Sequence, residues 1–190
     1  GIVPLREGYE KVKRRIAPDL ETLPYPVNPV VPFLKTVHDR VSMEIARGCT
    51  RGCRFCQAGY LYRPVRERSP NKILETIETV LKNTGYDEIS LLSLSSADYG
   101  CISPLLKALM DTYESKRVAV SLPSLRVGSL TRDLIDEIVK VRKTGFILAP
   151  EAGTERLRNV INEGISEEDL VLNSRNAFEA GWRVIKLYFM

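Results

Sequence analysis

From residue 41 onward, short apolar segments alternate with longer amphipathic ones. The short segments are rich in β-branched and aliphatic residues, and they predict strands at 41–47, 87–94, 117–122, 145–149 and 182–189. The longer segments repeat apolar residues at helical spacing, and they predict helices at 70–84, 104–115, 132–143 and 167–180. Strands that alternate with helices of this length are joined by right-handed crossovers, so the pattern predicts an α/β fold with parallel strands.

The predicted helices carry recognisable start and stop signals. A hydroxyl side chain can accept a hydrogen bond from a free amide of the first turn, and such a residue precedes each helix at Ser69, Ser103, Thr131 and Ser166. Proline follows the first two of these residues, where its missing N–H costs nothing. Glycine adopts the left-handed conformation that ends many helices, so we expect Gly85 and Gly145 to end the first and third.

The first 37 residues lack this alternation. They carry five prolines between positions 18 and 32, and each proline removes a backbone donor and favours an extended neighbour. We therefore predict a proline-rich linker at 1–37 and a core domain at 38–190. Because the chain starts at Gly1 and ends inside a predicted strand, we expect it to be a piece of a longer protein with flanking domains.

Three cysteines lie within eight residues, at Cys49, Cys53 and Cys56. Thiolates at these offsets can wrap a short loop around one [4Fe–4S] cubane and bind three of its irons, leaving the fourth iron open. A structural zinc site is an alternative, but it requires four ligands, and the rest of the chain offers only Cys101 and His38. A disulfide or an unrelated thiol cluster is a further alternative. We expect Cys101 to be a small apolar core residue.

The CxxxCxxC motif, the aromatic Phe55 and the preceding strand Val41–Ala46 resemble those of the radical S-adenosylmethionine (radical SAM) enzymes. The resemblance implies that S-adenosylmethionine binds the open iron and is cleaved to a 5′-deoxyadenosyl radical. It also implies a partial parallel (β/α)6 barrel, which this chain would leave truncated after the fifth strand. Functional groups of such barrels gather at the carboxyl ends of the strands.

The resemblance implies cofactor contacts after the second and third strands. Many family members have a Gly-Gly-Glu-like motif after the second strand, whereas this chain has Ser93, Ser95, Ser96 and Asp98 and no glycine there. These residues are candidates for contacting the methionyl amine, and a plain serine-rich turn is the alternative. After the third strand, the planar fork of Arg126 is a candidate for the methionyl carboxylate, or it is a surface side chain.

After the fourth strand, Glu151 is the candidate for accepting hydrogen bonds from the ribose hydroxyls or the methionyl amine. Gly153 would permit the turn that follows, and Thr154 would cap a helix that begins at Glu155. Phe55 is the candidate for lining the nucleoside pocket. No catalytic residue is assigned beyond these cofactor contacts.

The wider sequence, from residues 31–34 through 38–40 to 91–99, resembles uncharacterised bacterial radical SAM proteins with an upstream cobalamin-binding-like domain. Cobalamin would then be held by a domain outside this chain. Three functions remain open: a radical SAM enzyme of unknown substrate, an RNA-modifying relative of the methylthiotransferases, and a noncatalytic iron–sulfur or zinc module. The alternating aromatic and basic residues at 60–68 are a candidate RNA contact, with a solvated loop as the alternative.

Charge and hydropathy narrow the range of possible partners and cellular locations. Lys and Arg total 28 against 24 acidic residues, and a net charge of +4 is too mild to indicate nucleic acid by itself. We see neither a signal peptide nor an apolar run long enough for a membrane span, so we expect a cytoplasmic protein with no membrane partner. The expected partners are a small-molecule or RNA substrate and a reductant such as flavodoxin or ferredoxin.

Overall fold

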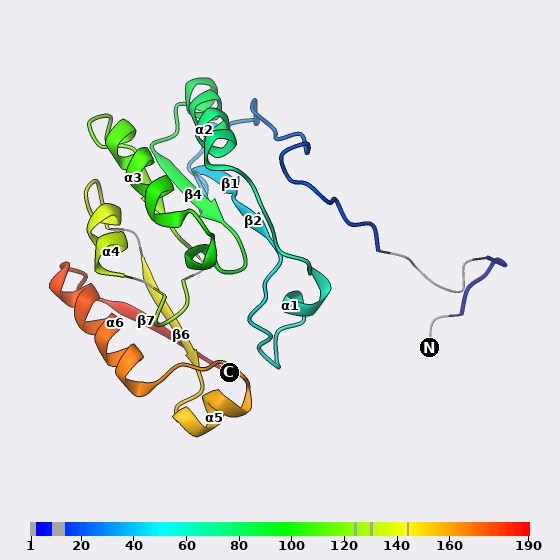
Figure 1. Ribbon diagram of the computed structural model, residues 1–190. Helices are drawn as coiled ribbons and strands as arrows, with labels where there is room; N and C mark the ends of the chain where they lie inside the picture. Colours follow the sequence, from blue (N-terminus) through cyan, green and yellow to red (C-terminus); the bar gives the residue numbers. More distant parts are fainter. Residues whose placement is uncertain (1–2, 9–13, 124, 130, 144) are drawn as a thin grey trace.

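A computed structural model describes residues 3–8, 14–123, 125–129, 131–143 and 145–190 (Figure 1). Residues 1–2 and 9–13 of the predicted linker lie outside the described residues. The five predicted strands are all present, within one or a few residues of their expected bounds, and they alternate with helices along the chain. The α/β fold with parallel strands is therefore confirmed.

The strands form two parallel sheets. In the first sheet, β1 (Val41–Glu44) pairs with β4 (Glu88–Leu92), which pairs with β5 (Ala119–Ser121). In the second, β6 (Phe146–Glu151) pairs with β7 (Ile185–Phe189). Among the described residues, no ladder of hydrogen bonds joins β5 to β6.

A small antiparallel hairpin departs from the sequence prediction. The predicted strand 41–47 is split in two: after β1 the chain forms β2 (Ala46–Arg47), which pairs with β3 (Arg66–Glu67). The short helix α1 (Ala58–Leu61) lies between β2 and β3. The hairpin brings both ends of the cysteine-bearing segment back to the edge of the first sheet.

Three of the predicted helix starts are confirmed. Helix α2 (Pro70–Thr84) has the predicted bounds: the Ser69 hydroxyl accepts the amide of Lys72, and Gly85 ends the helix at φ 72°. Helix α6 (Glu167–Glu179) begins with a capping box between Ser166 and Asp169. The start of α4 (Arg132–Ile138) is also correct, because Thr131 caps it.

Two signals were misread. Helix α3 (Ile102–Tyr113) has Cys101 at its N-cap position, so Ser103 lies inside the first turn and caps nothing. Helix α4 ends at Ile138, well before Gly145, although Val139 and Val141 still pack against the core from irregular backbone. These apolar residues have the spacing of a helix, so the sequence predicted a longer helix than the one observed.

Helix α5 (Glu155–Val160) begins as predicted, with Thr154 as its cap.

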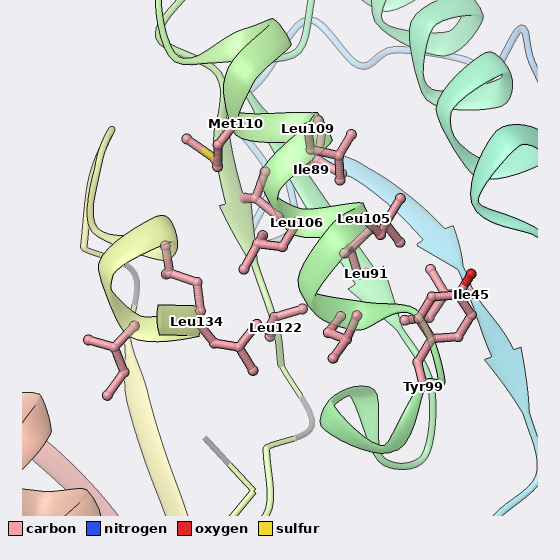
Figure 2. Close-up of a cluster of buried hydrophobic side chains, with 14 of the residues drawn as sticks. Ile45, Ile89, Leu91, Tyr99, Leu105, Leu106, Leu109, Met110, Leu122 and Leu134 are labelled. Carbon is pink, nitrogen blue, oxygen red and sulfur yellow. The ribbon is translucent and has the colours of Figure 1, made fainter. Parts of the chain in front are cut away.

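The core lies between the first sheet and the helices that cover it. Figure 2 shows α3 directing Leu105, Leu106 and Leu109 toward Ile89 and Leu91 of β4. All five side chains are 1% exposed or less. The cavity described below opens beyond the carboxyl ends of these strands, away from this packing.

The described part of the predicted linker contains no helix or strand between residue 14 and β1, and it runs past the edge strand. Several hydrogen bonds hold it against the core, including the following two from a buried and a half-buried side chain. The buried Arg68 donates to the Leu20 carbonyl at 2.6 Å, and the Tyr25 hydroxyl donates to the Ser42 carbonyl. The boundary at residue 37 stays a prediction. In the described part of the chain, no helix is long and apolar enough to cross a membrane.

Candidate cofactor site

The cysteine loop, residues 49–56, leaves the end of β2 through a strained turn. Gly48 has φ 99°, a backbone conformation that favours glycine. The loop is tied down from the α1 side by Arg63, which donates to the carbonyls of Cys49 and Thr50, both at 3.3 Å. These contacts place the three cysteines at the carboxyl ends of the strands, as expected for a barrel of this type.

One cavity of about 280 Å³ opens in front of the loop. It collects most of the site residues predicted from the sequence, namely Cys49, Cys53, Phe55, Cys56, Ser95, Arg126 and Glu151. The remaining wall comes from the cysteine loop itself, from the segments after β4, β5 and α5, and from strands β6 and β7. It is formed by Arg51, Leu94, Pro123, Leu125, Ile147, Ala149, Glu163 and Tyr188. Side chains distant in sequence thus meet around a single space.

The three motif cysteines are half-buried free thiols. Burial and the neighbouring Glu163 carboxylate raise the pKa of the Cys53 thiol to about 12. A metal bound by this thiol would have to displace its proton. In the described part of the chain, no three cysteine, histidine or acidic side chains converge on a position for one metal ion. A cubane offers each thiolate its own iron, so three cysteines around one cavity suit it better than they suit a single zinc ion.

Cys101 lies apart from this cavity. It is half-buried at the start of α3 and packs against the hydrophobic core. The prediction that it is a packing residue is consistent with this position.

Two charged side chains predicted from the sequence lie in the cavity wall. Arg126 forms a largely buried ion pair with Glu163, with 2.9 Å between Nε and Oε1. Glu151 adopts φ 63° at the irregular end of β6, an unfavourable conformation for a residue with a side chain. Burial, with a smaller contribution from Glu163, raises the pKa of Glu151 above its usual range.

The serine-rich segment after β4 divides into different roles. Ser95 lines the main cavity, whereas Ser93 accepts the amide of Ser95 at 3.2 Å. Ser96 is fully buried and donates to the Leu91 carbonyl at 3.0 Å, so its hydroxyl stabilises the turn. A contact of Ser96 with the cofactor stays a prediction.

Asp98 belongs to the wall of a smaller neighbouring cavity of about 50 Å³, behind Cys49. Arg51 holds it with two hydrogen bonds, one of them 2.7 Å from Nε to Oδ2. This guanidinium keeps the pKa of Asp98 below its usual range. A direct contact of Asp98 with the cofactor stays a prediction.

The arginines of the aromatic and basic segment 60–68 form hydrogen bonds to backbone carbonyls of the protein itself. Arg63 binds carbonyls of the cysteine loop, Arg66 donates to the carbonyls of Ala17 and Pro64, and Arg68 is buried. Guanidinium groups that satisfy backbone carbonyls are less available to phosphates. These hydrogen bonds argue against an RNA contact at this segment, and they also differ from the predicted alternative, a loop with solvated charges.

Sequence reasoning missed Arg51, Glu163 and Tyr188 of the cavity wall. It also missed Asn162, whose side-chain amide donates to backbone carbonyls of the cysteine loop. Arg51 lies inside the cysteine motif, so its position offered a signal. Glu163 and Asn162 follow α5 in an unremarkable stretch, and only the folded chain brings them to the cysteine loop. Tyr188 lies in a strand whose pattern does not reveal which face meets the cavity.

Residues 43–190 match a family model described as the Radical SAM superfamily. An uncharacterised protein of Methanocaldococcus jannaschii is 34% identical over 181 residues, which cover 95% of this chain and 39% of that protein. A tRNA-2-methylthio-N(6)-dimethylallyladenosine synthase of Desulforamulus reducens is 26% identical over 135 residues, which cover 66% of this chain and 29% of the synthase. The chain thus spans about two fifths of the length of the first relative and less of the second.

Solved structures are similar in fold. The radical S-adenosylmethionine methyltransferase TsrM of Kitasatospora setae, solved with cobalamin and a [4Fe–4S] cluster, superposes with a TM-score of 0.65 at 13% identity. The match covers 78% of this chain and 30% of TsrM. OxsB, a cobalamin-dependent S-adenosylmethionine radical enzyme, gives a TM-score of 0.59 at 15% identity, covering 78% of this chain and 23% of OxsB. The family match over most of the chain shows that it belongs to the radical SAM superfamily of enzymes.

Proposed function

We propose that this chain is the core of a radical SAM enzyme in which Cys49, Cys53 and Cys56 hold a [4Fe–4S] cluster and the adjoining cavity receives S-adenosylmethionine. One observation carries the proposal: the three thiols share a cavity with a guanidinium, a carboxylate and an aromatic ring from other segments of the fold. The donor set fits a cluster, because three soft thiolates leave one iron for another ligand. When bound, the cluster and S-adenosylmethionine supply a 5′-deoxyadenosyl radical.

The residues of the chain bind and orient. Arg126 donates to Glu163 through Nε, so its other guanidinium N–H groups can donate to the methionyl carboxylate. Glu151 and Ser95 can hydrogen-bond with the ribose hydroxyls or the methionyl amine, and the half-exposed Phe55 offers a face to the nucleoside. The apolar wall residues, such as Leu125 and Ile147, exclude water from the space in front of the thiols.

Further parts of the proposal concern the whole protein. The site needs a one-electron reductant such as flavodoxin or ferredoxin, and we place the protein in the cytoplasm, where such carriers work and thiols stay reduced. Cobalamin is a further proposed cofactor, bound by a domain outside this chain, as TsrM and OxsB are cobalamin-binding proteins of the same fold. The substrate is a small molecule or an RNA.

A second candidate is RNA modification, favoured by the similarity to the tRNA-modifying synthase. The internal hydrogen bonds of Arg63, Arg66 and Arg68 argue against segment 60–68 as the RNA contact, so another surface would have to provide it. A filter-binding titration with tRNA over a range of salt concentrations tests this candidate, because phosphate contacts make affinity fall steeply with salt. If tRNA shows no salt-dependent binding to this chain, RNA modification by residues of this chain is not supported.

The test of the main proposal is anaerobic reconstitution with iron and sulfide, followed by electron paramagnetic resonance of the reduced protein with and without S-adenosylmethionine. We expect a [4Fe–4S]⁺ signal that changes on adding the cofactor, and no such signal from Cys49→Ala. A cluster whose signal ignores S-adenosylmethionine would indicate an electron-transfer module. Tightly bound zinc in place of iron would indicate a structural module.

A further inference from the structure

The middle of the cysteine loop is held by a segment more than one hundred residues away in sequence. The Arg54 amide donates to the Ile161 carbonyl at 2.8 Å, and the Arg54 side chain donates to the Val160 carbonyl. The Asn162 amide group donates to the carbonyls of Gly52 at 2.9 Å and Arg51 at 3.2 Å. These bonds grip the backbone between the first two cysteines and just before the third.

This segment, residues 160–163, is itself held firmly. The Arg158 side chain is 3% exposed and donates to the carbonyls of Ile165 at 2.7 Å and Ala152 at 3.1 Å. The Arg158 carbonyl in turn accepts the amide of Glu163 at 2.8 Å. Asn162 has φ 60°, a conformation that asparagine tolerates better than most side chains. The backbone that carries the side-chain amide of Asn162 is therefore held in one conformation.

The two partners of this contact belong to different halves of the fold. The cysteine loop follows β2 beside the first sheet, whereas segment 160–163 follows α5 and the strand β6 of the second sheet. Within the described ranges, the two sheets are not joined by a strand ladder. Contacts between loops must supply part of the connection, and those of Asn162 fall on the backbone that carries the cysteines.

We propose that Asn162 is a positioning residue that holds the cysteine loop in its cluster-binding shape before the cluster arrives. A preset loop loses less conformational freedom on binding, so the cluster is held more tightly. Coupling is reciprocal, so a bound cluster also stabilises segment 160–163 and the packing of the second sheet. The inference rests on the proposed function for the identity of the bound group, while the pinning of the loop belongs to the protein alone.

Two variants isolate the hydrogen bonds of Asn162. Asn162→Asp keeps the shape and tolerates the left-handed backbone, but it replaces the donor with an acceptor. Asn162→Gly removes the amide group without adding a charge and without backbone strain. The matched control is Asn159→Asp, which makes the same chemical change at an exposed position of helix α5, just before segment 160–163.

Two measurements test the proposal on this chain. The first is hydrogen exchange of the backbone amides of residues 50–56 without metal, and the second is the rate at which a chelator removes iron from the reconstituted protein. We expect both Asn162 variants to exchange and to lose iron about tenfold faster than the wild type, the effect of losing one or two hydrogen bonds. Asn159→Asp should match the wild type in both.

The outcomes separate the two proposals. If both Asn162 variants exchange amides and lose iron at the same rates as the wild type, the positioning role is overturned. The proposed radical SAM function is unaffected by that result. A wild-type protein that takes up no cluster would overturn the proposed function, while exchange in the metal-free loop would still decide the role of Asn162. Faster exchange in Asn162→Asp but not in Asn162→Gly would assign the effect to the added charge and would also overturn the positioning role.

Discussion

Gly48 is the residue at which a single methyl group should damage the site most directly. It precedes Cys49 and has φ 99°. A Cβ atom at this position would lie 2.5 Å from the Tyr62 carbonyl oxygen and 2.8 Å from that of Pro64. Both obstacles are backbone atoms, so no side-chain rotation can relieve them.

The size of the effect follows from this geometry. Ordinary contact begins at 3.4 Å, so the chain at Tyr62 would have to retreat by about 0.9 Å. Backbone strain at a left-handed residue costs about 1–3 kcal/mol, and forcing packed groups apart costs about 1–3 kcal/mol more. For Gly48→Ala we expect a loss of about 2–6 kcal/mol in the free energy of unfolding, or an equivalent local opening of the cysteine loop.

The assay is urea denaturation of the metal-free protein together with iron content after anaerobic reconstitution. Gly48→Ala should lower both the stability and the iron content. Gly59→Ala is the control, because its Cβ would meet no atom within 4 Å and it lies in helix α1, where alanine is favoured over glycine. Normal stability and full iron content in Gly48→Ala would refute the view that the turn before Cys49 requires glycine.

Two further predictions concern the cluster ligands and pH. Cys53→Ala should sharply reduce the iron content of the reconstituted protein, whereas Cys101→Ala should leave it unchanged; the reverse would show that the ligands are misassigned. Burial raises the pKa of Glu88, but hydrogen bonds from Arg40, Arg142 and Ser121 outweigh it and hold that pKa below the ordinary value of 4.5. The ion pairs therefore stabilise the fold above pH 4.5 and fade as the pH falls through the lower folded value. Glu88→Gln should cost about 1–3 kcal/mol at pH 7 and progressively less below pH 4.5 in urea denaturation, and a pH-independent difference would contradict this.

Some elements could be predicted because their signals are local. The apolar stripe of α2, its Ser69 cap and the Gly85 stop lie within one stretch of sequence, and the structure reproduces all three. The same logic failed for α4, because Val139 and Val141 keep the apolar spacing while packing from irregular backbone. Hydrophobic spacing reports burial, and burial does not require a helix.

The candidate site shows the same division. Cys49, Cys53 and Cys56 could be proposed as ligands from their spacing alone, since the three thiols lie within eight consecutive residues. The buried position of the Ser96 hydroxyl could not be predicted, because the direction of a side chain in a turn depends on the hydrogen bonds of that turn. Glu163 could not be anticipated, because its partners Cys53 and Arg126 come from other segments.

The sequence by itself determined the order of strands and helices, the cysteine loop and its place after the first strand, because periodicity, caps and ligand spacing act over a few residues. Only the tertiary structure decided that the parallel strands divide into two hydrogen-bonded sheets and that Asn162 donates to backbone carbonyls of the cysteine loop. It also decided which charges line the cavity and that the arginines of segment 60–68 serve the fold. Long-range hydrogen bonds and burial choose their partners in space, and a single sequence carries no local signal for that choice.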